Sequence, residues 1–345
     1  MKRLLILLFS IAILAGCGNK NGQPGQENED QKSENTIRKK SSSGKTLELL
    51  LVADRNVYAG DTKDRIKELF SHPQETFMTV EPIFDIVNIP YSSFQNTEMF
   101  RVHRNVIICN IGSENQNKVY RSEDQYAAPQ IVYEFSVKNL KALDSLMTKY
   151  APKVIEDMYT QEHRRIIKAF NGMRNTKLMQ ELKKNFDFTL TLSDEFEIAK
   201  MNDEFAWIRK EAKDFSIGVL VQVMPYTDKK QFDEAVVLNS LDSTMKKYVP
   251  GPAEGSYMGT ERRWEFTHKQ TKVSGQFAME TRGMFRTFGD YLGGPFVNYT
   301  VITPDNKTLV QLTAYTFSPR NTNQMPYAKR DHLMQVESIC HSIKF

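Results

Sequence analysis

The sequence lacks the features that would place a chain across a membrane several times or hold it together with disulfides. Apart from the eleven residues 4–14 it has no long hydrophobic run, whereas a membrane-spanning helix needs about 20 apolar residues. Three of its 345 residues are cysteine, and 46 Lys and Arg face 42 Asp and Glu, a formal charge of +4. Nucleic-acid-binding domains are usually strongly basic. These scarcities exclude a multi-span membrane protein, a disulfide scaffold and, on overall charge, a nucleic-acid partner.

The first 17 residues have the pattern of an export signal. Lys2 and Arg3 precede the apolar stretch, and Leu14-Ala15-Gly16-Cys17 follows it. This ending resembles the lipobox of bacterial lipoproteins, in which a diacylglycerol is attached to the Cys sulfur and a peptidase cleaves just before it. An ordinary signal peptide with an incidental Cys is the alternative. We predict a signal peptide over residues 1–16 and lipidation of Cys17, which leaves 44 basic residues and a charge of +2.

The segment after the lipidation site has the composition of a flexible tether. From Gly18 to Lys40 Ile37 is the only aliphatic residue, so the stretch cannot bury enough apolar area to offset its ordering entropy. We therefore assign residues 17–42 to the lipidated Cys and a tether, with the membrane as a partner through the lipid. Gly18 is not the Asp that is associated with inner-membrane retention in some bacteria. This favours the outer membrane, with the protein facing the periplasm.

The remaining length suits two domains, which we place at residues 43–172 and 173–345. The predicted fold class is α+β, with two related units that are each a mainly antiparallel sheet covered by helices. Apolar runs and alternating patterns predict these elements. Strands are expected at 47–53, 83–89, 105–111, 130–137, 186–192, 205–208, 217–224, 276–285, 296–302 and 309–317, and helices at 62–70, 140–150, 152–170, 232–248 and 328–343.

An internal similarity motivates the idea of related units. Residues 143–165 align without gaps with residues 241–263, and eleven of the 23 pairs are identical. The clearest part is Leu-Asp-Ser-x-Met-x-Lys-Tyr-x-Pro. We interpret this as an internal duplication, with chance similarity between two helices as the alternative.

Two further pairs of residues leave alternatives open. Cys109 and Cys340 could form a disulfide in an oxidising envelope, but they also fit two buried thiols, because cysteine packs like a small hydrophobic residue. Ser145 and Ser243 each follow an Asp and precede a hydrophobic residue or Thr, as in O-glycosylation acceptors of Bacteroidota. Both also lie in predicted helices, where they fit ordinary solvent-facing positions.

Several short stretches are similar to one uncharacterised family. They are Glu280 to Phe285, Gly293 to Phe296 and Lys329 to Asp331 in the second half, and Ser42 to Gly44, His103 to Asn105 and Pro129-Gln130 in the first. They resemble a Bacteroidota lipoprotein family catalogued as domain of unknown function 4837. The resemblance covers most of the mature chain and implies an envelope lipoprotein without an assigned activity.

Catalytic and cofactor motifs are missing from the sequence. Its six histidines are scattered, with no His-Glu-x-x-His, and it has no Gly-x-Ser-x-Gly nucleophile elbow. We therefore assign no catalytic residue, no metal and no cofactor. Sites assembled from residues far apart in the sequence are invisible to this survey.

Two groups of residues are candidates for a ligand or partner surface. Arg262, Arg263 and Trp264, with Glu280 and Arg282, offer guanidinium groups for a carboxylate or phosphate and an indole for stacking. Glu280 and Arg282 project from the same face of a strand and can pair. A solvated network of ion pairs around a half-buried Trp is the alternative.

The second group is Gly293, Gly294 and Pro295. Bare backbone here could approach a ligand closely, whereas a tight strand entry explains the same residues without a ligand.

From these observations we expect a non-catalytic binding or scaffolding lipoprotein of the cell envelope, with an envelope protein or a glycan as partner. The binding surface is either the groove between the two units or the Arg/Trp face. The alternative is an envelope hydrolase that acts on a glycan through a carboxylate pair such as Glu280 and Asp290, which requires two carboxyl groups about 5 to 10 Å apart in a cleft.

Overall fold

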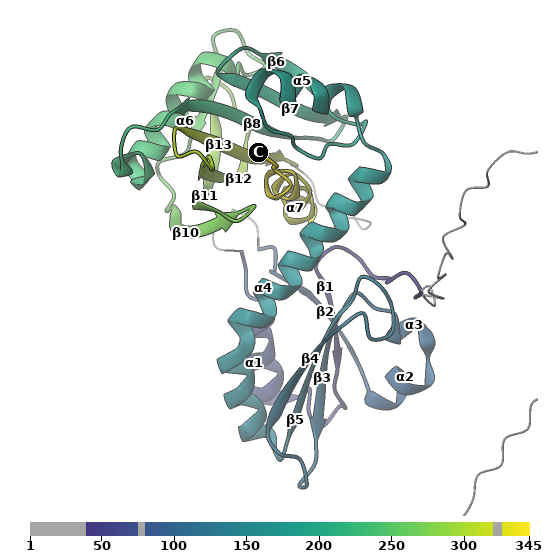
Figure 1. Cartoon of the computed structure of the whole chain (residues 1–345). Helices are drawn as coiled ribbons and strands as arrows, with labels where there is room; N and C mark the ends of the chain where they lie inside the picture. Colours follow the sequence, from purple (N-terminus) through teal and green to yellow (C-terminus); the bar gives the residue numbers. More distant parts are fainter. Residues whose placement is uncertain (1–38, 75–79, 320–325) are drawn as a thin grey trace, which may run out of the picture. The chain divides into compact units, whose positions relative to one another are not determined.

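Two β-sheets and the helices that cover them make up the part of the chain that this computed structural model describes, which is residues 39–74, 80–319 and 326–345 (Figure 1). The predicted signal peptide, Cys17 and most of the predicted tether lie outside these residues. Residues 39–345 form one unit. The α+β class expected from the sequence is confirmed.

The first sheet has the strand order β2-β1-β3-β5-β4. Its strands are β1 (Glu48–Val52), β2 (Asp85–Ile89), β3 (Asn105–Ile111), β4 (Lys118–Glu123) and β5 (Ile131–Val137). The β1–β2, β1–β3 and β3–β5 pairs are parallel, and only β4 pairs antiparallel, with β5. The expectation that this sheet is mainly antiparallel is therefore wrong.

Helices on both faces explain the parallel pairing. Helix α1 (Gly60–Phe70) and the first half of α4 (Leu140–Gly172) pack on one face, while α2 (Tyr91–Asn96) and α3 (Glu98–Arg101) pack on the other. Parallel strands buried on both faces are continuous apolar runs without alternation. The strands β1 and β3 show this pattern, since nearly every residue in them is buried.

The second sheet is antiparallel throughout, as predicted, and has the order β10-β11-β12-β13-β8-β7-β6, with β9 paired to β11. Its strands are β6 (Glu197–Met201), β7 (Phe205–Ala212), β8 (Phe215–Pro225), β9 (Tyr257–Thr260), β10 (Thr267–Val273), β11 (Gln276–Phe288), β12 (Gly293–Ile302) and β13 (Thr308–Phe317). The segment 186–192, expected as a strand, is not one. Phe186 ends α5, Asp187 has left-handed backbone angles, and the residues that follow form only a single bridge, from Thr189 to Lys344.

Helices cover this sheet on both faces as well. On one face α5 (Thr176–Phe186) and α7 (Ala328–His341) pack against the centre of the sheet. On the other face α6 (Glu234–Tyr248) packs against β8, β11, β12 and β13, and the short 3-10 helix η1 (Lys229–Phe232) precedes it. The closing helix α7 therefore lies between this sheet and α4, which it also contacts.

Helix α4 runs without interruption through Pro152, so the predicted break at this residue is wrong. Proline inside a helix removes one backbone hydrogen bond and crowds the preceding turn, at a cost of about 3 kcal/mol. The neighbouring Ala151, Val154 and Met158 are buried against the first sheet, and this packing offsets the cost. No helix among the described residues combines the length and the apolar composition that crossing a membrane requires.

The predicted internal duplication does not extend to the fold. The two sheets differ in strand number, order and direction. Residues 143–165 lie entirely in α4, whereas residues 241–263 comprise the end of α6, a loop and β9. The shared sequence reflects two amphipathic helical stretches, one near the start of α4 and one at the end of α6, in which Leu143 and Met147 are buried like Leu241 and Met245. We therefore withdraw the interpretation of two related units.

The two cysteines of the folded unit are free thiols. Cys109 lies in β3 and Cys340 in α7, and both are buried. Burial raises the pKa of Cys109 to about 12 and that of Cys340 well above its ordinary value. The structure thus favours two buried thiols over a disulfide.

Candidate functional site

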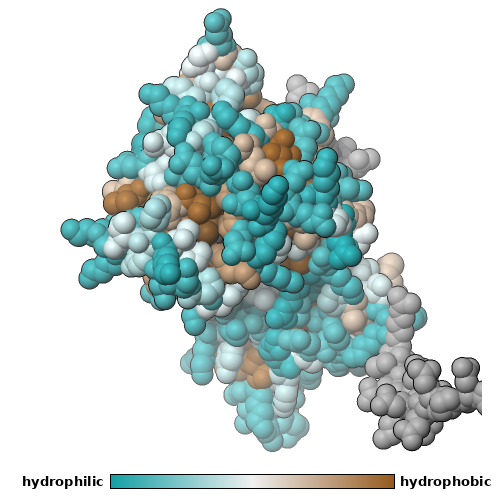
Figure 2. Space-filling view, turned by 45° about the horizontal axis from the view of Figure 1, so that its top comes forward, coloured by the Kyte–Doolittle hydropathy of each residue, from teal (hydrophilic) through white to brown (hydrophobic). Residues whose placement is uncertain are grey.

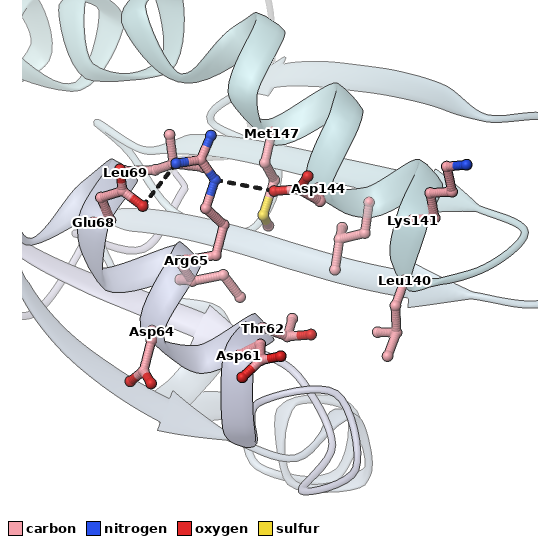
Figure 3. Close-up of a pocket in the computed structure, with 12 residues that line it drawn as sticks. Asp61, Thr62, Asp64, Arg65, Glu68, Leu69, Leu140, Lys141, Asp144 and Met147 are labelled. Atoms are coloured by element: carbon pink, nitrogen blue, oxygen red, sulfur yellow. Dashed lines mark hydrogen bonds and ion pairs between the residues drawn. The ribbon is translucent and has the colours of Figure 1, made fainter.

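Several hollows in the described part of the chain are large enough for a small molecule, and two of them differ clearly in their linings. The first, of about 650 Å³, lies between α1 and the start of α4 (Figure 3). Its central cation, Arg65, is already engaged, because its side chain binds Glu68, Asp144 and Thr148. All of these groups lie at the protein surface, where ion pairs contribute little. This hollow therefore offers no unusual chemistry.

The second hollow has about 840 Å³ and is lined by α4, α7, the strands β10, β11 and β12, and by His72, Gln74 and Ile83. We call it the α4–α7 cavity. Its volume falls in the range of about 300 to 1,000 Å³ that is usual for small-molecule sites. It differs from the first hollow because buried ionisable side chains face it. We therefore take it as the candidate site.

The inner wall of the α4–α7 cavity is a network of four polar side chains, which we call the polar floor: Glu280, Arg282, Tyr299 and Glu337. The Nε of Arg282 donates to Oε1 of Glu280 over 2.7 Å, and its Nη2 donates to Oε1 of Glu337. The Tyr299 hydroxyl lies 2.6 Å from the same Glu337 oxygen and 3.1 Å from Oε2 of Glu280. One guanidinium group thus holds two carboxylates that come from a strand and a helix.

The ionisation of the polar floor follows from burial and from the Arg282 charge. Burial alone raises the pKa of Glu280, but Arg282 outweighs it and lowers this pKa to about 2. The pKa of Glu337 is lowered for the same reasons. The pKa of Arg282 is raised well above its ordinary value by the two carboxylates, against the effect of burial. Both glutamates are therefore anionic at neutral pH.

Two histidines adjoin Glu337 at the same end of the cavity. His341 lies four residues after Glu337 on α7, and His163 faces them from α4. The two imidazole rings are stacked, with centroids 4.2 Å apart. One ligand atom from each of the three side chains lies within 4.8 Å of the others. We call these three residues the His–Glu cluster.

The hydrogen bonds of His163 fix its tautomer. The Ser338 hydroxyl donates its single proton to the carbonyl of Met334 over 2.6 Å. Its oxygen therefore accepts from Nδ1–H of His163, 2.9 Å away. The lone pair of this imidazole must then be on Nε2. Burial and the neighbouring His341 lower the pKa of His163 to about 3, so the ring is neutral at physiological pH.

Cations predominate at the mouth of the α4–α7 cavity, where the exposed Glu156 is paired with Lys153. Arg164 and Lys272 line the mouth and are exposed, and among the described residues neither has an ion-pair partner. Lys269, also at the mouth, contacts Glu280 over 3.2 Å. The cavity therefore combines cations at its entrance with carboxylates and neutral imidazoles at its inner end.

The structure separates the predicted Arg/Trp surface into unconnected pairs. Arg262 binds Asp242 on α6, and Arg263 binds Glu261 through two hydrogen bonds. The Trp264 side chain is 45% exposed. Both arginines are thus engaged within the protein, as in the network of ion pairs that was the alternative interpretation. Figure 2 shows that the face in view is mainly hydrophilic, with scattered hydrophobic groups.

Gly293, Gly294 and Pro295 form the start of β12 and pair with β11. At Gly294 an added Cβ would lie 2.0 Å from the carbonyl oxygen of Thr316 on the neighbouring strand. The close approach that requires glycine here is therefore an approach of β13. These three residues make a strand entry, and none of them lines the α4–α7 cavity.

The carboxylate pair proposed for a hydrolase is not brought together. Glu280 lies inside β11, whereas Asp290 follows the end of that strand. At about 3.3 Å per residue the eight positions from Glu280 to Phe288 already span roughly 26 Å. In the α4–α7 cavity it is Glu280 and Glu337 that lie close together, since Arg282 binds both.

Sequence reasoning identified the Glu280–Arg282 pair but missed its partners. Strand alternation places these two side chains on one face, and the structure shows the pair. The sequence could have indicated that Glu337 and His341 are neighbours, because residues four apart on a helix lie on the same face. For His163 and Tyr299 it held no such indication, because only the tertiary structure brings them to α7.

Comparison with known proteins identifies two uncharacterised domains. Residues 175–342 match the family described as domain of unknown function (DUF4837), and residues 42–171 match a second family, domain of unknown function (DUF8532). Each match covers less than half of the chain. The match over residues 175–342 agrees with the resemblance proposed from the sequence, whereas residues 42–171 match a different family model. No curated protein matches the chain.

Two solved structures show a weak similarity to parts of the chain. A mutant of protein Mog1 is 12% identical, covering 46% of this chain and 89% of its own, with a TM-score of 0.28. A thioesterase from Haemophilus influenzae is 8% identical, covering 42% and 92%, with a TM-score of 0.16. At these scores neither likeness carries an argument about fold or function.

Proposed function

We propose that this chain is a lipid-anchored binding protein of the cell envelope, whose α4–α7 cavity takes up a small anionic ligand. The observation that carries the proposal is the polar floor, since it places three buried polar side chains and the partly buried Arg282 at the inner wall of a cavity of ligand size. Buried charges are costly and are retained where they fix a structure or meet a ligand. An opening toward solvent favours the second role.

The charge distribution supports an anionic ligand. Arg164 and Lys272 at the mouth are available to a phosphate or carboxylate group, because no carboxylate among the described residues engages them. An arginine binds such groups through two parallel hydrogen bonds. The two imidazoles at the inner end add polar contacts. A small phosphate- or carboxylate-bearing molecule fits this arrangement better than a neutral sugar does.

The polar floor argues for binding rather than for glycan hydrolysis. A glycosidase needs one carboxyl group that stays protonated near neutral pH to act as the general acid. Glu280 and Glu337 share Arg282, and both have lowered pKa values. Neither can therefore serve as that acid.

The anchor is proposed from the sequence. The charged start, the short apolar stretch and the Leu-Ala-Gly-Cys ending support lipidation of Cys17, and the absence of Asp at position 18 favours the outer membrane, facing the periplasm. In the native host we expect the chain to incorporate labelled palmitate and to fractionate with membranes. The Cys17→Ala variant should do neither. Unchanged labelling and fractionation of this variant would refute the anchor.

Binding is tested by thermal unfolding of the full chain in detergent. Phosphate, pyrophosphate and citrate are the anionic probes, and maltose is the neutral one. We expect an anionic probe to raise the Tm, and the Arg164→Ala/Lys272→Ala double variant to lose this shift. The matched control is Arg55→Ala/Lys118→Ala, which removes two exposed cations outside the cavity.

Either of two results would contradict the proposed ligand class. A Tm shift with maltose alone would indicate a glycan site instead. An anion effect of the same size in both double variants would show that the anions act through general charge screening.

A further inference from the structure

We propose that His163, Glu337 and His341 bind a divalent transition-metal ion at the inner end of the α4–α7 cavity. This inference deepens the proposed function, on which its role rests: the ion holds the anionic group of the ligand. The sequence alone indicated no metal site. The observation that carries the proposal is the convergence of two imidazoles and one carboxylate from two helices.

The ligand set fits such an ion. Two histidines and one carboxylate, with further positions left open, are characteristic of Zn²⁺ sites that bind water or substrate and of non-haem Fe²⁺ sites. The ligand atoms of the His–Glu cluster lie within 4.8 Å of one another. With bonds of about 2.0 to 2.1 Å, a tetrahedral ion draws such atoms to roughly 3.3 Å apart. Small side-chain rotations are enough to close this difference.

The imidazoles are in the state that metal binding requires. Ligating histidine must be neutral, with one ring nitrogen free to bind, and one nitrogen of each ring has a hydrogen-bond partner: the Ser338 hydroxyl for His163 and the Tyr299 hydroxyl for His341. His163 is further oriented by Ser338, which accepts its Nδ1–H and leaves Nε2 as the donor atom. A hydrogen-bond acceptor for the ring nitrogen that does not bind the ion is a recurring feature of metal-ligating histidines.

Glu337 has one oxygen to spare for the ion. Its Oε1 accepts from Arg282 and from the Tyr299 hydroxyl. Its Oε2 has a single hydrogen bond, from Nη1 of Arg282 at 3.5 Å, the longest contact in the polar floor. The carboxylate can therefore bridge the guanidinium group and the ion. Glu280 also holds Arg282, and its negative charge offsets the repulsion between the two cations.

The place of the cluster leaves room for a ligand on the ion. All three side chains line the α4–α7 cavity, so the positions that the protein does not fill face the cavity and not the core. An anion bound there has the ion at its inner end and Arg164 and Lys272 at the mouth. The proposed site thus accounts for both ends of the cavity.

The test is metal binding by the full chain, untagged, purified in detergent and freed of metal with EDTA. Calorimetric titration with Zn²⁺ should show one site. Titration with Co²⁺ should produce the visible absorption of an ion bound to protein nitrogen and oxygen. For His163→Ala, Glu337→Gln and His341→Ala we expect the Zn²⁺ affinity to fall by more than the roughly 10- to 100-fold that is lost when a residue hydrogen-bonded to a metal ligand is removed.

Two further variants separate coordination from folding. Ser338→Ala leaves all three ligands in place and should weaken Zn²⁺ binding by about 10- to 100-fold. His72→Ala removes a histidine that lines the same cavity but lies outside the cluster, and it should bind like the wild type. For each variant we also compare the Tm with Zn²⁺ to the Tm of the same variant without metal. Because each variant is its own reference, this comparison also applies to a variant that is less stable than the wild type.

The inference is overturned if the wild type binds neither ion, or if substitution of the three ligands leaves the affinity unchanged. Its failure can be told apart from failure of the proposed function by repeating the anion titrations with EDTA present. Anion binding without metal binding keeps the cavity as a ligand site and removes the ion. Metal binding without any anion effect keeps the ion and removes the proposed ligand.

Discussion

Removal of the Arg282 guanidinium group should destabilise the protein strongly, and by an amount that depends on pH. In Arg282→Met two buried carboxylates lose their shared cation and face each other across the Tyr299 hydroxyl. Removing one partner of a buried ion pair typically costs about 3 to 5 kcal/mol. Because the Arg282 side chain is 20% exposed, we expect a loss of unfolding free energy at the lower end of this range, about 3 kcal/mol at pH 7.

The sign of the pH dependence follows from the pKa shifts. In the wild type the folded-state pKa of Glu280 is about 2, below its ordinary value of 4.5. Its stabilising contribution is therefore complete above about pH 4.5 and is lost as the pH falls toward 2. In the variant, burial and mutual repulsion raise the pKa of at least one carboxyl group, so the folded state gains stability on protonation. The difference in free energy of unfolding between the wild type and Arg282→Met should therefore become smaller as the pH falls from 7 to 4.

Urea unfolding of both proteins at several pH values, with EDTA present, measures this difference. The matched control is Arg209→Met, because Arg209 also binds two glutamates, Glu197 and Glu211, but does so at the surface. An exposed pair of this kind contributes about 1 kcal/mol or less. A loss for Arg282→Met as small as that of the control, or one that is constant between pH 4 and pH 7, would refute the reasoning.

Three further predictions concern packing, titration and thiol reactivity. Gly294→Ala should lower the free energy of unfolding by at least 1 to 3 kcal/mol, because its Cβ would lie 2.0 Å from the Thr316 carbonyl oxygen; a stability within 0.5 kcal/mol of the wild type would contradict this close approach. Burial raises the pKa of Asp331 from 3.8 to about 6, so this group makes the wild type lose up to about 3 kcal/mol as the pH rises from about 4 to 7. Denaturation curves of Asp331→Asn should lack that loss, and identical pH profiles would refute it. In Cys17→Ala, Cys109 and Cys340 should not react with Ellman's reagent at pH 8 until the protein unfolds, so rapid labelling of the native protein would contradict their burial.

The sequence was sufficient to predict most of the strands that build the two cores. The meander β11–β12–β13 and the closing helix α7 follow from alternating and helical apolar patterns, and the structure confirms them. The polar strands β4 and β6 were missed because most of their residues are at least partly exposed and show no apolar face. Strands are predicted from the apolar residues that they bury, so a strand with little buried surface shows no apolar pattern in the sequence.

The direction of the strands in the first sheet was the larger error. A buried apolar run is found in both parallel and antiparallel sheets. The feature that points to a parallel strand is the lack of alternation between apolar and polar residues, because it indicates burial on both faces. The runs in β1 and β3 had this feature. The internal similarity misled for a related reason, since two amphipathic helical stretches can share sequence although one helix continues, as α4 does, and the other ends, as α6 does.

The candidate site was predictable only in part, because it is assembled from four separate elements. Two residues apart on a strand, Glu280 and Arg282 had to share a face. Four residues apart on a helix, Glu337 and His341 had to do the same. Nothing in the sequence indicated that α7 would lie against both β11 and α4, and without that contact His163 is a solitary histidine.

Native mass spectrometry of the chain purified from the membranes of its own host tests the central claim most directly. If the α4–α7 cavity binds an ion and a small ligand, the wild type should carry an added mass that chelation and mild heating remove. The His163→Ala/His341→Ala variant should have the mass of the lipidated chain alone. A wild type without added mass, or the same added mass in both proteins, would contradict the account.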